Sequence, residues 1–376
     1  MTLGQGVWYS TAVRVNGRTR PVMAKSYDGR PIKLDGNPDH PLAKGKSDAQ
    51  TQAVLLDLYD PDRGGLDLAQ PGVYHDGPHQ REGSAWKSVS WSVLDQTAGE
   101  RLKRAGKILL ITGPVDGPAQ RAYLDDLNAV LGRRMVHVAY HPFAESAAVQ
   151  ARQYVFASDS KPTYRLDRAR ILVALGSDFL GGGTTGIVEQ VQYGAFRRGV
   201  DGEPGQVICF EPTMSQLGTC ADVRVRISPE QAAWVGWGIA AQVAQELGVT
   251  LPSAVAAALP GQLAIFESKL RPVRSAHGEV SPLRFAAERL LAAKKLGSHS
   301  LVYVGCAAQC HNSELHRVAT WLNVILGNEG QTLIPAPVTE HGPDVLLAHL
   351  EKSDEFDVVI IAGANPAFDA PRVVEL

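Results

Sequence analysis

The chain has 376 residues, which is enough for about two lobes with separate hydrophobic cores. Its 37 Lys and Arg residues nearly balance its 39 Asp and Glu residues, so no basic field favours nucleic acid or an anionic membrane. No apolar run approaches the roughly 20 residues of a membrane span, and the first ten residues lack the pattern of a secretory signal. We therefore expect a soluble chain, which would be cytoplasmic if it is complete as written.

The first 92 residues predict a small β-rich lobe followed by a loop. Turn signals at Asp28-Gly29 and Gly36-Asn37-Pro38 separate short strands. A helix is expected over Ala49–Tyr59, because Ser47 or Asp48 can cap its start and Asp60-Pro61 ends it. Residues 64–92 are rich in Gly, Pro and His and are expected to be mostly loop.

Residues 93–280 predict a first Rossmann-like α/β lobe, in which short apolar strands alternate with helices. Its clearest part is the apolar run Ile171–Leu175, a glycine-rich turn, a helix ending at Arg197-Arg198 and the strand Val207–Phe210. This order is typical of a βαβ crossover in a parallel sheet, with the turn at the carboxyl end of a strand, where such sheets bind ligands. The other expected strands are Ile108–Thr112, Val136–Tyr140 and Val223–Ile227.

Residues 281–376 predict a second α/β lobe that is apparently truncated. Helices are expected over Ser281–Lys295 and Ser313–Leu326, and strands over Leu301–Val304 and Val358–Ala362. The predicted fold class is therefore α/β, with parallel-sheet lobes and a small β-rich lobe at the amino terminus.

The pattern Gly181-x-Gly183-x-x-Gly186 matches the dinucleotide fingerprint in its letters. It begins several residues after the strand, and no acidic residue closes the next strand in the expected way. A free-standing NAD-type oxidoreductase that uses this turn is one alternative. A turn without a ligand, or one that approaches another nucleotide, is favoured over it.

The four cysteines suggest two kinds of site, a metal site and a disulfide. Cys306, Cys310, His311 and His316 are residue types that bind zinc, but the expected state is small buried thiols and a solvated histidine. Cys209 and Cys220 bracket one loop and would be able to form a disulfide in an exported chain, although their spacing cannot establish the geometry. Four cysteines in all are too few for a disulfide framework.

Several spaced motifs resemble one known family. They are Gly29–Pro41, Leu58–Arg63, Asp178-Phe179-Leu180, Glu211–Asp222 and Gly363-Ala364-Asn365-Pro366. Together they are similar to the molybdopterin oxidoreductase large-subunit family, and most of all to the molybdopterin-like first half of the iron–sulfur subunit of alternative complex III. The resemblance spans nearly the whole chain.

The resemblance implies a vestigial pterin-dinucleotide groove. The residues that would line it are Gly176, Asp178, Glu211, Asp222, Gly305, Gly363 and Asn365. Glycines after strands permit the backbone to approach a pyrophosphate, and the carboxylates would accept hydrogen bonds from a guanine edge or a ribose hydroxyl. The competing interpretation is that the acidic residues only cap turns and strand ends.

The resemblance also shows a deficit. Family members carry a four-cysteine [4Fe–4S] motif near the amino terminus, whereas Val7–Tyr27 contains no cysteine. We therefore expect no catalytic residue, no metal ligand and no cofactor in this chain, which would be a scaffold in a quinol-oxidising respiratory complex.

The same resemblance implies the partners and the place of the chain. They are a ferredoxin-like iron–sulfur subunit or a missing C-terminal half, membrane quinol-binding subunits and cytochrome c subunits, so that clusters and haem lie on partner chains. Such a complex would hold the chain on the periplasmic face of the membrane. The alternative is a fragment of an active enzyme that binds molybdopterin guanine dinucleotide.

Overall fold

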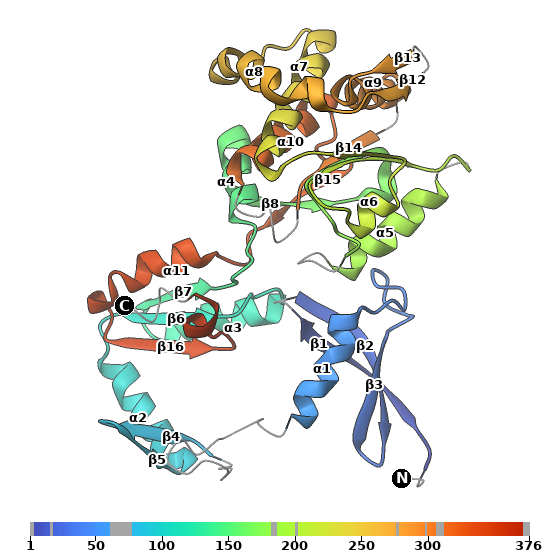
Figure 1. Cartoon of the computed structure of the whole chain (residues 1–376). Coiled ribbons are helices and arrows are strands. Elements are labelled where there is room, and N and C mark those ends of the chain that lie inside the picture. The colour runs from blue at the N-terminus through green and yellow to red at the C-terminus, as the bar shows by residue number, and fades with distance from the viewer. Residues whose placement is uncertain are drawn as a thin grey trace. The chain divides into compact units, whose positions relative to one another are not determined.

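Figure 1 shows the computed structural model of the chain, which describes residues 4–15, 18–60, 77–181, 186–199, 202–275, 278–297, 299–305 and 312–370. The chain divides into two compact units. Unit 1 is Met1–Pro142 with Thr339–Leu376, and unit 2 is Phe143–Val338.

The boundaries of these units differ from those of the lobes predicted from the sequence. The predicted boundary after residue 92 falls inside unit 1, and the one after residue 280 falls inside unit 2. Strand β16 (Val358–Ala362) pairs with β6 (Ile108–Thr112), and β14 (His299–Tyr303) pairs with β9 (Ala169–Leu175). Each sheet therefore joins segments that are far apart in the sequence, and lobes drawn as continuous stretches do not follow such pairing.

Unit 1 begins with a small antiparallel sheet. It has the order β1-β2-β3, and α1 packs on it. The side chain of Asp48 caps α1 by accepting a hydrogen bond of 2.7 Å from the backbone N–H of Thr51. The bounds are β1 Val7–Val15, β2 Arg18–Tyr27, β3 Arg30–Gly36 and α1 Ala49–Tyr59.

The region expected to be mostly loop contains a short hairpin, β4 (His79–Glu82) with β5 (Ala85–Ser88). Its turn includes Gly83, which adopts a positive φ of 61°. Such a turn is a local signal for a hairpin. The expectation of loop was therefore wrong for residues 79–88.

The rest of unit 1 is a three-layer α/β arrangement. Among the described residues its sheet is three-stranded and parallel, with the order β16-β6-β7. One face packs on Leu346 of α11, and the other packs on Leu131 at the end of α3. The remaining bounds are α2 Trp91–Arg104, α3 Pro118–Val130, β7 Met135–Ala139, α11 Pro343–Leu350 and α12 Pro366–Asp369.

Unit 2 is built on a parallel sheet with the order β11-β10-β9-β14 among the described residues. One face of this sheet packs on α7, α8, α9 and α10, and the other on α5 and α6, as Figure 1 shows. The bounds are α4 Ser146–Phe156, α5 Ile187–Arg198, β10 Gln206–Glu211, α6 Gln216–Thr219, β11 Val223–Arg226, α7 Ala232–Leu247, α8 Ser253–Phe266, α9 Pro282–Lys295 and α10 Ser313–Leu326.

Glycines let α7 approach its neighbours closely. A Cβ on Gly236 would lie 2.7 Å from Cγ1 of Val318 in α10, and a Cβ on Gly238 would lie 2.4 Å from Cδ2 of Leu283 in α9. Such distances are too short for a side chain, so these glycines permit the helix layer to pack densely.

Two further strand pairs in unit 2 were not predicted. They are β8 (Ser160–Tyr164) with β15 (Leu333–Pro337), and β12 (Val273–Ser275) with β13 (Gly278–Val280). Prolines weaken the strand signal in the first pair, where Pro162 lies opposite Pro335. The predicted fold class is nevertheless confirmed: the chain is α/β, with parallel sheets and a small antiparallel amino-terminal sheet.

Candidate functional site

The sheet of unit 2 has a topological switch point between β9 and β14. The chain passes from β9 to β10 and β11 in one direction, and β14 then pairs on the other side of β9. In open α/β sheets the crevice at the carboxyl ends of two such strands is the usual ligand site. Gly176, with φ +61°, follows β9, and Gly305 follows β14. The Ser177 hydroxyl donates a hydrogen bond to the carbonyl of Gly305, so the structure brings these two glycines together.

Asp178 and Glu211 also lie at this carboxyl edge, on either side of the start of α6. The Asp178 carboxylate accepts hydrogen bonds from the backbone N–H of Gly181 at 3.0 Å and of Leu217 at 3.1 Å. The Glu211 carboxylate accepts from the N–H and hydroxyl of Ser215 and from the guanidinium of Arg224.

The environment of Glu211 keeps it ionised. Its side chain is only 3% exposed, and this burial acts to raise its pKa. The hydrogen bonds from Ser215 and Arg224 outweigh the burial, and the pKa lies below its usual value. Much of the accepting capacity of both carboxylates is therefore used inside the protein, as the interpretation of structural capping expects.

Asp222 lies at the opposite edge of the same sheet. It precedes β11, and its carboxylate accepts hydrogen bonds of 2.7 Å from the backbone N–H of Val207 and from the guanidinium of Arg197. Val207 is near the amino end of β10. The structure therefore does not bring Asp222 together with Asp178 and Glu211.

Unit 1 has a second switch point, between β6 and β16. Gly363 follows β16 with φ +66°, and Asn365 precedes α12. Gly113 follows β6 and was not predicted; a Cβ on it would lie 2.7 Å from the carbonyl oxygen of Gly363. The two turns are thus in close contact. The signal for Gly113 was a glycine directly after a predicted strand.

A cavity of about 420 Å³ opens beside this second switch point. It is bordered by Thr112, Gly113 and Ala362 at the strand ends and by Tyr123 and Leu124 of α3. The seven residues predicted for the groove therefore lie in three places: Gly176, Asp178, Glu211 and Gly305 at the carboxyl edge of unit 2, Asp222 at its amino edge, and Gly363 and Asn365 in unit 1.

The structure tests the possible nucleotide site at the glycine-rich turn only in part, because residues 182–185 lie outside the described residues. Gly186 precedes the first residue of α5. Contrary to the expectation that no acidic residue closes the next strand, Glu211 is the last residue of β10. Because its carboxylate is buried and paired with Arg224, it is not free to accept from a ribose hydroxyl, and the arrangement does not favour an NAD site.

The zinc alternative rests mostly on residues outside the described part of the chain, namely Cys306, Cys310 and His311. His316, expected to be solvated, is instead 3% exposed, because α10 packs against both α4 and α7. Within the described residues, no group of three or more His, Cys, Asp or Glu side chains could hold a metal ion.

Cys209 and Cys220 are both free cysteines in the structure. Cys209 lies inside β10, where burial, aided by Glu211, raises the pKa of its thiol. Cys220 lies at the exposed end of α6. The structure therefore contains no disulfide between them.

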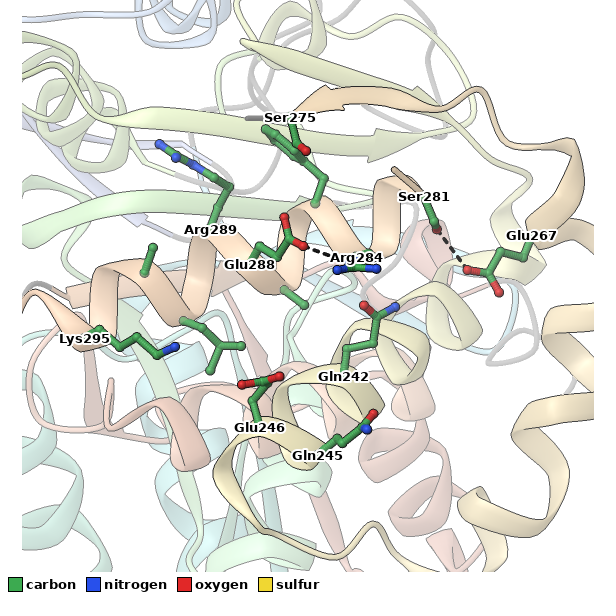
Figure 2. A pocket seen from close by; sticks show the side chains of 14 residues that line it. Gln242, Gln245, Glu246, Glu267, Ser275, Ser281, Arg284, Glu288, Arg289 and Lys295 are labelled. Carbon is green, nitrogen blue, oxygen red and sulfur yellow. Dashed lines mark hydrogen bonds and ion pairs between the residues drawn. The ribbon is translucent and has the colours of Figure 1, made fainter. Parts of the chain in front are cut away.

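The largest of the cavities described here, about 840 Å³, lies between α7 and α9 in unit 2 (Figure 2). Its lining carries charges of both signs. Arg284 pairs with Glu288 at 2.8 Å, and the Ser281 hydroxyl donates to Glu267, as the dashed lines in Figure 2 mark. It includes none of the strand-end turns.

The α/β architecture, with parallel sheets and a small antiparallel amino-terminal sheet, matches the fold of the molybdopterin enzymes. A solved structure with this fold is acetylene hydratase from Pelobacter acetylenicus, with a TM-score of 0.56 and 15% identity; the similarity covers 86% of this chain and 44% of that one. At this identity the similarity establishes only the fold.

A curated relative adds a sequence similarity. The chain is 23% identical over 223 residues to the menaquinone reductase, molybdopterin-binding-like subunit, of Nitratidesulfovibrio vulgaris. The match covers 58% of this chain and 30% of the relative. The chain is thus a distant homologue of molybdopterin oxidoreductase-like proteins. No protein-family model matches the sequence.

The residues present do not fit an iron–sulfur cluster in the small amino-terminal lobe. Such a cluster needs thiolate ligands, and the first cysteine of the chain is Cys209. Glycines stand after strands at both switch points, and a backbone without side chains is what close approach of a pyrophosphate requires. Separately, no helix in the described parts of the chain has the length and apolar character needed to cross a membrane.

Proposed function

We propose that the chain is a molybdopterin-oxidoreductase-like subunit of a respiratory quinol:electron-acceptor oxidoreductase of the alternative complex III type. In this complex it acts as a scaffold without a redox centre of its own. The similarity to a molybdopterin-binding-like subunit of a menaquinone reductase supports the class of complex.

The observation that carries the scaffold role is the distribution of thiols. The folded amino-terminal lobe, β1–β3 with α1, spans Val7–Tyr59 and contains no cysteine, so no [4Fe–4S] cluster is ligated there by thiolates. Without that cluster, electrons have no relay into the rest of the chain.

In the proposed complex, electrons pass through centres on other polypeptides. These are a ferredoxin-like iron–sulfur subunit or C-terminal half, and haem-bearing cytochrome c subunits, which take electrons from membrane subunits that bind quinol. The chain supplies shape and contact surface on the periplasmic face.

Metal analysis of the purified chain tests the scaffold role. We expect iron and molybdenum far below one atom per chain, with no paramagnetic signal from the subunit alone. A molybdopterin enzyme prepared in the same way serves as the positive control. Stoichiometric molybdenum or a cluster signal in this chain contradicts the scaffold role, whereas isolation of the native chain without any quinol-oxidising partner contradicts membership of the complex.

A second candidate is part of an active enzyme that binds molybdopterin guanine dinucleotide. The observation in its favour is that both parallel sheets keep glycine turns at their switch points, Gly176 with Gly305 and Gly113 with Gly363. Its test is the release of oxidised, fluorescent pterin and of guanosine monophosphate after acid treatment. One or more equivalents per chain favours this candidate over the scaffold.

A further inference from the structure

A separate cavity in unit 2 is lined by four cations and no carboxylate. It has a volume of about 610 Å³, within the range of small-molecule sites. The cations are Arg224, Arg226, Lys269 and Arg271. We call it the cationic cavity.

Two short segments of similar pattern build this cavity. In Arg224-Val225-Arg226, at β11, and in Lys269-Leu270-Arg271, which follows α8, an apolar residue stands between two cations. Val225 and Leu270 both pack against the main hydrophobic core of unit 2. In β11 side chains alternate between the two faces, so the burial of Val225 directs Arg224 and Arg226 away from that core. Both segments are thus anchored by their central residues beside the cavity.

The charges of the cavity are only partly balanced. Arg224 is paired with Glu211. Arg226, Lys269 and Arg271 make no ion pair with any other described residue, and all three are exposed. The chain as a whole has a net charge of -2, so this concentration of positive charge does not reflect a basic protein.

Three like charges around one cavity repel one another. Like charges repel even in bulk water, and they repel more strongly where water is partly excluded. A bound anion removes this repulsion. Guanidinium groups match phosphate oxygens in a bidentate manner, and Leu270, Pro272 and Val273 add apolar surface beside the cations.

We propose that the cationic cavity binds an organic phosphate, with its phosphate groups on Arg226, Lys269 and Arg271 and its organic part against Leu270 and Val273. The cavity lies at β11, the edge strand, and β10 and β9 separate β11 from β14. It is therefore distinct from the switch point between β9 and β14, and the proposal does not depend on the proposed function.

Calorimetric titration of the full chain tests this proposal with three probes: adenosine diphosphate, inorganic pyrophosphate and soluble dihexanoyl phosphatidylglycerol. We expect saturable binding of at least one organic probe, tighter than that of pyrophosphate, which weakens as KCl is raised. The preferred organic probe distinguishes a nucleotide from a lipid headgroup.

The matched variants remove two charges each. Arg226→Gln with Arg271→Gln is expected to weaken binding at least about tenfold, because the double variant removes two charge-assisted contacts to the phosphate groups. Arg101→Gln with Lys103→Gln, on the exposed surface of α2, is expected to leave affinity unchanged. Lys269→Gln provides a second test if the first double variant does not fold.

Three results overturn the proposal. One is the absence of saturable binding of all three probes at millimolar concentration. The other is equal affinity in the wild type and in folded variants of the cavity. Tighter binding of pyrophosphate than of both organic probes also contradicts it, because the apolar wall would then contribute nothing.

Discussion

The two parallel sheets of this protein contain similar apolar strands in very different surroundings. In unit 2, Leu172, Val173 and Ala174 of β9 are fully buried, on both faces of the sheet. In unit 1, Val359 and Ile361 of β16 are 44% and 54% exposed. Their neighbours in register on β6, Leu109 and Ile111, are almost fully buried. The apolar run predicts a strand in both cases, but the position within the sheet decides how far it is buried.

The switch points differ in the same way. At the carboxyl edge of unit 2, Ser177, Ser215 and Arg224 donate hydrogen bonds to groups of the protein itself. In unit 1 the turn containing Gly363 is exposed and borders a cavity. A nucleotide-binding fold can therefore keep its glycine turns while its polar groups serve the protein's own stability.

The largest expected effect on the free energy of unfolding comes from shortening one apolar side chain in each of the two strands, β9 and β16. Leu172→Ala removes a fully buried side chain and is expected to lower the free energy of unfolding by about 3 kcal/mol. Ile361→Ala is expected to lower it by less than about 1 kcal/mol, since its side chain is half exposed. Urea unfolding followed by circular dichroism measures both. Equal losses would show that β16 is covered as completely as β9.

A somewhat smaller effect is expected in the buried amide network of unit 2. Asn328, 1% exposed, donates to Asn323 at 2.9 Å and accepts from the N–H of Ser300 at 3.3 Å. Asn328→Ala is expected to cost about 2 kcal/mol, because it leaves buried partners unsatisfied.

Asn128 is the matched position in unit 1, where its side chain accepts from the N–H of Met135 at 3.1 Å and is only partly buried. Asn128→Ala is expected to cost about 1 kcal/mol in the same unfolding measurement. A larger loss at Asn128 than at Asn328 would reverse the ranking of the two units.

The next test is the dependence of stability on pH. The pKa of Glu211 is lower in the folded protein than its usual value of 4.5. Its contribution is therefore present above pH 4.5 and is lost as the pH falls through the folded pKa. Glu211→Gln is expected to be less stable at neutral pH and to lose less stability on acidification.

Asp357 in unit 1 serves as the control, because backbone N–H groups of Lys107 and Gly106 lower its pKa while it remains exposed. Asp357→Asn is expected to change the acid slope less than Glu211→Gln. Thermal unfolding at a series of pH values from 3 to 7 measures both slopes. If Glu211→Gln leaves the dependence of stability on pH unchanged, the Glu211 carboxylate does not contribute to the loss of stability in acid.

The smallest effect is expected from Val359→Thr on the exposed face of β16. The free energy of unfolding should change by less than about 0.5 kcal/mol. Exposed apolar edge strands favour self-association, so light scattering at high protein concentration is expected to decrease. A loss of more than 1 kcal/mol would mean that another part of the chain covers this side chain.

Local patterns predicted many elements well. Asp48 caps α1, and Gly248 ends α7 in the left-handed conformation, with φ +67°. Caps and turns depend on a few neighbouring residues, so they can be recognised without knowledge of the fold. The strands β8 and β15 were missed because each depends on a partner about 170 residues away and carries proline.

The candidate site was only partly predictable for a related reason. Asp178 follows β9 and Glu211 ends β10, so both lie at the carboxyl edge, whereas Asp222 precedes β11 and lies at the amino edge. All three stand beside strand ends in the sequence. Attention to strand direction would have separated Asp222 from the other two, because parallel strands place their carboxyl ends at one edge.

The amino-acid sequence alone established the α/β class, the glycine turns after strands and the absence of any cysteine before Cys209. These are local or compositional properties. The tertiary structure decided which strands pair, that β16 lies at an exposed edge and that Arg224 neutralises Glu211. Those outcomes depend on contacts between residues distant in the chain, and short-range periodicity carries no information about which distant segment a strand or a charge will meet.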